Sequence, residues 1–519
     1  MTPKYGIFEL ALPGPKEGNP FLEVDLTARF SGDGREFKVS GFYDGEGVYK
    51  VRFSPEAEGE WRYVTACNVP ELDGISGSFA CGAAEEGSHG PVQVAERFHF
   101  AHADGTRFIP VGTTAYAWTS QDDETCEMTI DTLSKAPFNK IRMSPFPKHY
   151  LYNHNEPPCY PFEGGLRPGM TAEAAVEQAG ADFASSVSPA YEFDFDRPNP
   201  AFWRRFEGYL ERLGKIGIQA DLILFHPYDR WGFSQMGRER SLNYLRYVVA
   251  RLGAYSNIWW SMANEYDLFF TWTEEDWEAC AAQVVKWDAA NHLRSIHNCL
   301  KFYDHSRPWI THCSIQRIAY HSHAELTAQW REQYGKPVAV DEICYEGDID
   351  CGWGNITAEE MVKRFWDVMT RGGYCTHGET YLRDDDLLWW AKGGELTGES
   401  PARIAFLRQI MEEAPGFVDP KEPPEWDVSW GYAGERFEEE GNIAFRGRGQ
   451  VPYAQWMLCY FSFARPSFRI FNLPQGRKYR IDVIDTWNMT VTPVEGLHSG
   501  RTRVELPARP YMAVRFVAE

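Results

Sequence analysis

Hydrophobic and polar residues alternate with a period of two in short segments over the first 90 or so residues, as in "FLEVDLTARF", "GVYKVRFSP" and "GEWRYVTACN". Turn signals such as Ser31-Gly-Asp-Gly34 separate these segments. The same alternation returns near the end of the chain in "YRIDVID", "RTRVELP" and "YMAVRFV". Short alternating segments between turns are typical of antiparallel β-sandwiches. We therefore predict an N-terminal β-sandwich over residues 1–92 and a smaller C-terminal β-sandwich over residues 425–519.

Residues 93–424 follow another pattern, in which an apolar strand, a loop and a helix repeat. The helix "TAEEMVKRFWDVMTRGG", for example, has Thr357 and Glu360 as a capping box and a glycine stop. Eight such strands over roughly 300 residues are typical of a (β/α)8 TIM barrel. A doubly wound sheet is the alternative, because the fifth and sixth segments are short. The predicted strands are Arg107–Thr113, Asn139–Met143, Gln219–Phe225, Ile258–Met262, Leu293–His297, Trp309–Thr311, Pro337–Asp341 and Gly373–Thr376.

Composition narrows the class of partner. The 519 residues are 43% apolar and 24% charged, which are the proportions of a globular protein. The net charge of −22 argues against a nucleic-acid-binding surface and favours a neutral or weakly charged partner. No apolar run approaches the roughly 18 residues of a membrane span, so no membrane partner is expected. Eleven scattered cysteines without a CxxC pair, and no leader at the N-terminus, predict a reducing cytoplasm. The sequence leaves a monomer and a homo-oligomer both open.

Polar side chains stand where the predicted barrel strands end. In a TIM barrel the carboxyl ends of the strands surround the reaction centre, so seven polar ends out of eight indicate a site. The residues at these ends are Arg142, His226, Asn264 with Glu265, His297, His312, Asp341 with Glu342, and His377 with Glu379.

Glu265 and Glu342 each follow an apolar strand, as in "IWWSMANEYDL". A carboxyl group at the edge of an apolar wall is poorly solvated, and its pKa can rise enough for it to donate a proton near neutral pH. A partner carboxylate, held ionised by Arg142, could attack a carbon that bears a leaving group. Two such carboxyls about 5–5.5 Å apart hydrolyse glycosides with retention, whereas a gap of about 6.5–9.5 Å admits a water molecule and gives inversion.

These residues resemble those of the clan A retaining glycoside hydrolases. In that resemblance Glu265 corresponds to the acid/base, Glu342 to the nucleophile, and Asn264 to the asparagine that holds the sugar 2-hydroxyl. "FNKIRM" resembles the second-strand segment, whose arginine maps onto Arg142, and "DLILFH" resembles the third-strand histidine segment, which maps onto His226. "GSHGPV" and "FHFAHADGTRFIPVGTTAYAW" are similar to the entry into apiosidase-like barrels, and the N-terminal sandwich is similar to the modules that precede them.

The sequence also departs from the clan. The sixth-strand His-x-Tyr would fall on His312 and Ser314, so its tyrosine is missing, and the eighth strand offers "HGETY" in place of a tryptophan. These changes leave the substrate open. Glu379 could bind substrate or balance His377, and His226 could bind substrate or be a core histidine. Several aromatic residues could form platforms for the apolar faces of sugars, or could be ordinary core residues. They are Trp118 and Trp231, with Tyr116, Trp353, Trp389 and Trp390.

We therefore predict a retaining glycoside hydrolase that acts on a neutral oligosaccharide or glycoside by double displacement and needs no cofactor and no metal. The long connection from Ser144 to Pro200 could close one end of the groove and make the enzyme exo-acting. A transglycosylase would use the same two glutamates, and a non-catalytic carbohydrate-binding barrel is a further alternative. Another is a metal-dependent barrel hydrolase, although the first strand lacks a His-x-His; it would be built on His226, His297, His312, His321 and His323.

Overall fold

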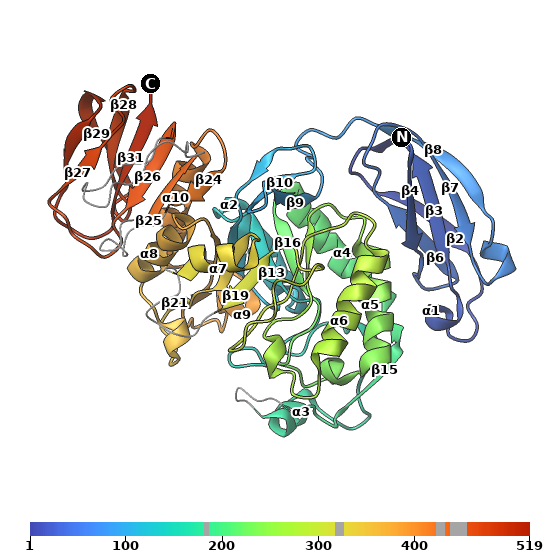
Figure 1. Ribbon diagram of the computed structural model, residues 1–519. Helices are drawn as coiled ribbons and strands as arrows, with labels where there is room; N and C mark the ends of the chain where they lie inside the picture. The colour runs from blue at the N-terminus through green and yellow to red at the C-terminus, as the bar shows by residue number, and fades with distance from the viewer. Residues whose placement is uncertain (181–185, 317–325, 422–430, 436–453) are drawn as a thin grey trace.

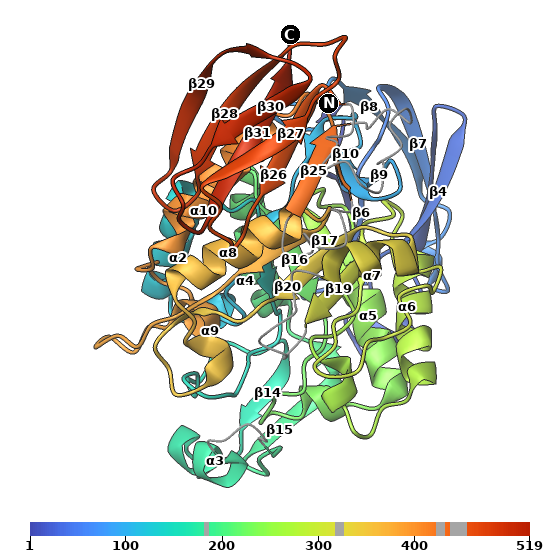
Figure 2. The same cartoon turned by 60° about the vertical axis from the view of Figure 1, so that its left-hand side comes forward.

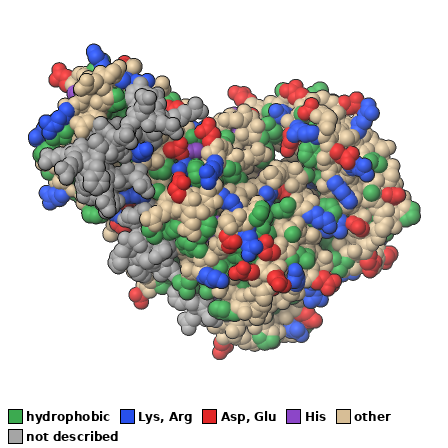
Figure 3. All heavy atoms as spheres, viewed as in Figure 1, with side chains coloured by type: hydrophobic (Ala, Val, Ile, Leu, Met, Phe, Trp, Pro, Cys, Tyr) green, Lys and Arg blue, Asp and Glu red, His purple; other side chains and the backbone are tan. Residues whose placement is uncertain are grey.

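The computed structural model describes residues 1–180, 186–316, 326–421, 431–435 and 454–519. Three β-rich parts lie side by side, with the N-terminal sheets on one side of a central barrel and the C-terminal sheets on the other (Figure 1). The predicted boundary between residues 424 and 425 lies outside the described residues. Acidic and basic side chains are interspersed over the face drawn in Figure 3. No helix in the described part of the chain is long and apolar enough to cross a membrane.

The N-terminal part is a sandwich of a five-stranded sheet, in the order β1-β8-β7-β3-β4, and a three-stranded sheet, β2-β6-β5. Alternate residues of the two sheets, such as Phe30, Val51 and Trp61, are fully buried between them. The predicted period-2 pattern therefore reflects one buried and one exposed face. The elements are β1 (Thr2–Pro3), β2 (Phe8–Pro13), α1 (Pro20–Glu23), β3 (Thr27–Gly32), β4 (Arg35–Ser40), β5 (Phe42–Tyr43), β6 (Val48–Phe53), β7 (Gly59–Ala66) and β8 (Ser76–Gly82).

The central part is a parallel eight-stranded barrel in the order β18-β17-β16-β13-β12-β22-β20-β19. A parallel bridge between His297 and Ser314 joins the two end strands and closes the barrel. The TIM barrel is thus confirmed, and the doubly wound alternative is wrong. The strands are β12 (Val111–Thr114), β13 (Lys140–Met143), β16 (Gln219–Ile223), β17 (Ile258–Ser261), β18 (Arg294–Ser295), β19 (Cys313–Gln316), β20 (Val338–Glu342) and β22 (Tyr374–His377).

Two predicted strands were placed wrongly. The first predicted strand is divided at Pro110, which cannot donate to a strand ladder. Its first part is β11 (Arg107–Phe108), which joins β10 (His99–His102) and β9 (Val92–Ala95) in a separate antiparallel sheet. The sixth strand is β19, four residues later than predicted. The predicted segment Trp309–Thr311 is a loop. Its apolar side chains are partly or wholly buried, so its sequence resembles that of a buried strand.

Helices surround the barrel and present apolar faces to it. In α4, for example, Phe202, Phe206, Leu210 and Leu213 recur at helical spacing and are buried. The helices are α2 (Asp123–Lys135), α4 (Pro200–Lys215), α5 (Arg238–Leu252), α6 (Glu274–Trp287), α7 (Thr327–Tyr334), α8 (Ala358–Met369), α9 (Trp389–Lys392) and α10 (Ser400–Glu412).

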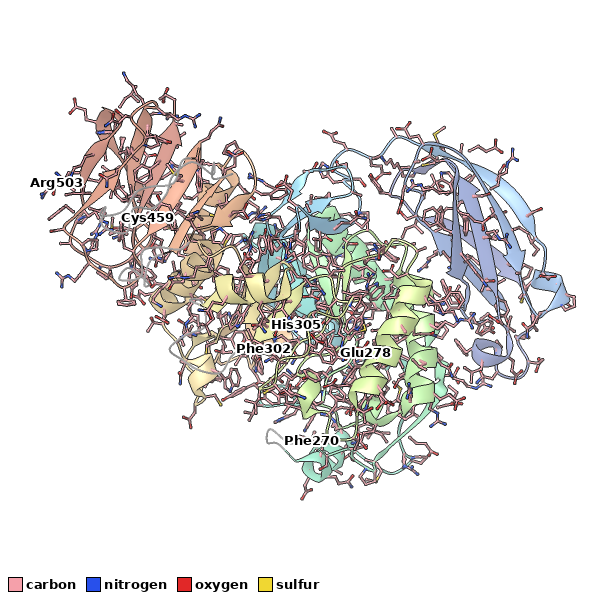
Figure 4. All side chains as sticks on the ribbon, in the orientation of Figure 1. Phe270, Glu278, Phe302, His305, Cys459 and Arg503 are labelled. Atoms are coloured by element: carbon pink, nitrogen blue, oxygen red, sulfur yellow. The ribbon has the colours of Figure 1, made fainter. Side chains whose placement is uncertain are left out.

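The long connection after β13 is a partly ordered insertion. It contains β14 (Phe162–Leu166), α3 (Ala172–Ala179) and β15 (Tyr191–Pro198), and it projects below the barrel in Figure 2. Phe270, which follows β17, is labelled at the same lower edge in Figure 4. The carboxyl ends of the barrel strands therefore open toward this insertion.

The C-terminal part packs a six-stranded sheet, β24-β25-β26-β31-β28-β29, against a two-stranded sheet of β27 and β30. Its first sheet contacts α8 of the barrel, for example through Trp366 and Tyr460, whose ring centroids are 5.3 Å apart. Its strands are β24 (Val418–Pro420), β25 (Gly431–Glu435), β26 (Trp456–Tyr460), β27 (Phe468–Asn472), β28 (Tyr479–Asp485), β29 (Thr490–His498), β30 (Arg501–Glu505) and β31 (Met512–Ala518).

Candidate active site

A cavity of about 260 Å³ lies among the loops that follow the barrel strands. Six of its fourteen lining residues are aromatic, and two glutamates and one lysine are the charged groups. Loops after seven of the barrel strands contribute, and β19 contributes its last residue, as expected for the carboxyl face of a TIM barrel. The lining residues are Tyr116, Lys148, Tyr150, Tyr228, Asn264, Glu265, Leu268, Cys299, Gln316, Glu342, Cys344, Tyr345, Trp353 and Trp390.

Glu265 follows β17 at the point where the chain turns into the short 3-10 helix η4 (Tyr266–Leu268). Its backbone is left-handed, with φ 51° and ψ 54°, a conformation that residues other than glycine rarely adopt. Strain of this kind is concentrated at functional sites. The turn directs the chain away from the strand immediately after the buried Asn264, and it brings the Glu265 carboxyl to the cavity wall.

Three neighbours hold the Glu265 carboxyl. Its Oε2 accepts hydrogen bonds from the Tyr228 hydroxyl and, at 3.3 Å, from Asn264 Nδ2, while its Oε1 accepts one from Gln316 Nε2 at 3.0 Å. These donors come from β19 and from the segments that follow β16 and β17, so the barrel itself fixes the orientation of the carboxyl group.

Glu342 ends β20 and faces the same cavity. Its Oε1 accepts a hydrogen bond from the Tyr116 hydroxyl, which also lies 3.3 Å from Asn264 Oδ1. Burial and the nearby Glu265 carboxyl raise the pKa of Glu342 to about 7, although Arg142 and Tyr116 act in the opposite direction. A neighbouring buried carboxyl disfavours the ionised form. Glu342 can therefore carry a proton near neutral pH.

Arg142, on β13, lies under the cavity and is fully buried. Its guanidinium donates to Asn264 Oδ1 and to Ser314 Oγ, both at 2.9 Å, and pairs with Asp341 at 3.1 Å. It reaches Glu342 only through its electric field, which lowers the pKa of Glu342. Arg142 therefore orients Asn264 and, through Asn264, the carboxyl of Glu265.

The barrel interior below Arg142 contains a closed set of charges. Lys140 Nζ lies 2.5 Å from Asp341 and 3.1 Å from Asp221, and all three side chains are buried. Burial alone would raise the pKa of Asp341, but Lys140 and Arg142 hold it well below its usual range. Asp341 also accepts hydrogen bonds from Ser314 and Thr376. It therefore ties neighbouring strands together inside the barrel and is turned away from the cavity that Glu342 lines.

Of the residues predicted from the sequence, Asn264, Glu265 and Glu342 line the cavity and Arg142 supports them. His226 does not line it. Its Nε2 lies 3.4 Å from the Phe146 carbonyl, and burial lowers its pKa to about 3, so it is a neutral core histidine. Trp118 packs on Tyr209, and Trp231 donates to Glu156 in the insertion, so neither faces the cavity. The aromatic walls come instead from Tyr116, Trp353 and Trp390.

His312 was expected at the end of the sixth strand, but it precedes β19. It packs edge-on against Phe100 and Trp259, away from the cavity. The sixth-strand residue that reaches the cavity is Gln316, since Ser314 and Gln316 alternate with the apolar Cys313 and Ile315 along β19. Reading "CSIQ" as the strand would have identified it.

Glu379 also lies outside the cavity. Its carboxylate accepts hydrogen bonds from the backbone amides of Thr397 and Gly398, and that of Glu346 accepts them from Glu399 and Ser400. With His377 these two glutamates are the described group close enough to hold a metal ion, with ligand atoms within 4.8 Å. Both carboxylates already hold the loop before α10. The alternative of a metal-dependent hydrolase gains no support from this group, because none of the histidines predicted for that alternative belongs to it. Two of those histidines, His321 and His323, lie outside the described residues.

Sequence comparisons identify the family. A model described as "Apiosidase-like, catalytic domain" matches residues 95–429, which is more than half of the chain. This chain belongs to the apiosidase-like family. Residues 1–68 and 448–517 match two domains of unknown function, DUF5060 and DUF5605. No curated protein matches the chain.

Solved structures agree with the apiosidase-like assignment. A crystal structure from Bacteroides vulgatus, described as a provisionally assigned glycoside hydrolase, is 35% identical, covers 100% of this chain and 99% of its own, and superposes with a TM-score of 0.88. A glycoside hydrolase family 5 structure from the same organism is 14% identical over 83% of this chain and 94% of its own, with a TM-score of 0.57, and supports the fold alone. The predicted enzyme class, a glycoside hydrolase, and its resemblance to clan A are confirmed.

Proposed function

We propose that this apiosidase-like protein is a retaining glycosidase that acts on a neutral sugar, with Glu342 as nucleophile and Glu265 as acid/base. The observation that carries the proposal is that these two glutamates, from the ends of the fourth and seventh strands, line one cavity, where Glu265 raises the pKa of Glu342. The strand from which each glutamate comes assigns its role, by resemblance to clan A. The raised pKa of Glu342 belongs to the free protein, in which burial and the Glu265 carboxyl both disfavour its ionised form.

The reaction follows from this arrangement. The Glu342 carboxylate attacks the anomeric carbon while Glu265 gives its proton to the departing glycosidic oxygen, so one C–O bond forms as another breaks. Glu265, now a carboxylate, then takes a proton from water as that water attacks the glycosyl ester and releases Glu342. Each carboxyl needs a fixed orientation, which Tyr116 gives to Glu342 and Tyr228 and Gln316 give to Glu265.

The charges of the lining favour a neutral sugar. Lys148 is the cationic side chain of the lining, and Glu265 and Glu342 are its two acidic side chains. An acidic sugar would add a further buried negative charge beside these two carboxyl groups. The aromatic walls suit the apolar faces of a sugar ring.

The size of the cavity supports exo-action. Its 260 Å³ is smaller than the roughly 300–1,000 Å³ of pockets that hold drug-sized ligands, so it suits one sugar unit better than a chain. Tyr150, from the insertion after β13, forms part of the wall. We therefore propose that the enzyme removes terminal residues.

A panel of aryl glycosides that spans the common sugars tests the proposal, with the anomer of the first product followed by proton NMR. We expect one sugar to be cleaved with retention. We expect Glu342→Gln to reduce kcat by at least roughly 10³-fold, because a carboxamide cannot form the ester. Glu278→Gln, on the outer helix α6 (Figure 4), is the matched control and should leave kcat unchanged. An inverted first product, or normal activity in Glu342→Gln, would refute the mechanism.

A further inference from the structure

Lys148 lies in the loop after β13, and its ammonium group is enclosed by aromatic rings. Its Nζ lies 3.9 Å from the ring centroid of Tyr116, 4.4 Å from that of Tyr228, and 4.9 Å from those of Tyr150 and Trp390. The residue is 5% exposed and lines the cavity that holds the two glutamates. This arrangement has no signal in the sequence, because the four rings come from loops far apart in the chain.

This ammonium group lacks the partners that other buried lysines have. The backbone carbonyl of Lys148 accepts a hydrogen bond from Asn153 at 2.8 Å, but no described residue pairs with its Nζ or accepts a hydrogen bond from it. By contrast, Lys140 pairs with Asp341 and Asp221, and Lys392 with Asp386. Burying an unpaired charge is costly, and cation–π contacts offset only part of that cost. Groups that retain such a cost are concentrated at functional sites.

The charged groups that act on Lys148 are those of the reaction. They are Glu265 after β17 and Glu342 on β20, which favour the ammonium form, and Arg142 on β13, which opposes it. The hydroxyl-bearing rings of Tyr116, Tyr150 and Tyr228 complete the surroundings. Burial lowers the pKa of Lys148 to about 8. In return, the positive charge of Lys148 lowers the pKa of Glu342.

We infer that Lys148 is a positioning residue, whose caged ammonium is the counter-charge that stabilises the ionised carboxylates of Glu265 and Glu342. This inference rests on the proposed function. An acceptor bonded directly to the ammonium would localise and screen its charge. The aromatic cage instead holds it near both glutamates without an ion pair to either, so its field acts on the pair.

Lys148→Met tests the inference, because methionine keeps an apolar stem in the aromatic cage and removes the charge. Lys301→Met is the matched control, since Lys301 is an exposed lysine two residues after the lining residue Cys299. With the best aryl glycoside, we expect kcat of Lys148→Met to fall roughly 10-fold or more at pH 6, with KM changed less than about threefold. The acidic limb of kcat/KM should move up by roughly one pH unit, because Glu342 then ionises at higher pH. Lys301→Met should change neither.

A direct hydrogen bond from Lys148 to substrate would give another result, namely a raised KM with both pH limbs in place, and would overturn the inference. Unchanged kinetics would overturn it as well.

A readout without substrate separates this inference from the proposed function. Carbon-13 NMR of glutamate carboxyls should show a signal that titrates near pH 7 in the wild type, is absent from Glu342→Gln, and moves to higher pH in Lys148→Met. If no glycoside is cleaved but this shift appears, the proposed function fails and the electrostatic role of Lys148 stands. If glycosides are cleaved but the signal does not move, the role of Lys148 is wrong.

Discussion

The barrel holds two groups of buried charges that differ in how well their charges are matched. Inside the strands, Lys140 and Arg142 lie within ion-pair distance of Asp221 and Asp341, in a closed set. At the carboxyl ends of the strands, Lys148 has aromatic rings in place of anions, and Glu265 and Glu342 have tyrosine and amide donors in place of cations.

This contrast separates buried charges that stabilise the barrel from buried charges that are available to a substrate. Charges in ion pairs stabilise one another and interact only weakly with a ligand. Charges without an ion-pair partner can interact with a substrate when it binds. Burial alone does not make the distinction, since both groups are removed from water. The three predictions below change one group at a time.

The largest expected effect comes from removing the proposed proton donor. Glu265→Ala should reduce kcat/KM roughly 10²–10⁴-fold for glycosides with a poor leaving group, because the departing alkoxide then receives no proton. For dinitrophenyl glycosides the loss in the glycosylation step should be far smaller, since dinitrophenolate leaves without protonation. Steady-state rates over a series of leaving groups measure this. Equal losses across the series would show that Glu265 is not the acid.

The second effect concerns stability and breaks the matched group. Asp341→Asn leaves Lys140 and Arg142 short of an anion in the barrel interior and should lower the free energy of unfolding by about 3–5 kcal/mol, as measured by urea unfolding. Asp131→Asn is the matched control, because its ion pair with Lys135 is exposed and should be worth less than about 1 kcal/mol. Lys148→Met should not destabilise the protein, since it removes an unpaired charge. If Lys148→Met proved as damaging as Asp341→Asn, the contrast between the two groups would be lost.

The smallest effect is a pH dependence of stability that belongs to the unmatched group. Folding raises the pKa of Glu342 from 4.5 to about 7, so the folded state binds a proton more tightly than the unfolded chain does. The stabilisation from this proton is complete below about pH 4.5 and is lost as the pH rises toward 7, by up to about 3 kcal/mol. Glu342→Gln cannot lose a proton, so its stability relative to the wild type should increase between pH 5 and pH 8. Parallel stability curves for the two proteins would contradict the raised pKa.

The sequence predicted the parts of the site that belong to strands. Asn264, Glu265 and Glu342 follow apolar runs long enough to identify, and Arg142 lies within one, so periodicity places all four. Lys148, Tyr150 and Tyr228 could not be found in this way, because they lie in loops. In a loop, no regular spacing along the sequence indicates which way a side chain points. Their meeting depends on how the insertion after β13 folds back over the barrel mouth.

The errors have equally local causes. His312 was given a site role because Trp309 and Ile310 imitate a strand, although they are loop residues that pack on the core. The true strand, β19, has only two apolar residues, Cys313 and Ile315, which face away from the barrel interior. Glu379 and Trp231 were plausible from their neighbours in sequence, but hydrogen bonds to segments distant in the chain use their polar groups. Such pairings are tertiary, and one sequence does not contain them.

The left-handed backbone at Glu265 affects which residues evolution would be expected to place at this position. A side chain in that conformation costs on the order of 1–3 kcal/mol, and glycine would remove most of the cost. In the proposed function, the carboxyl group is what opposes that replacement. A descendant of this chain that had given up this chemistry and kept its architecture would then be expected to carry glycine or asparagine at position 265.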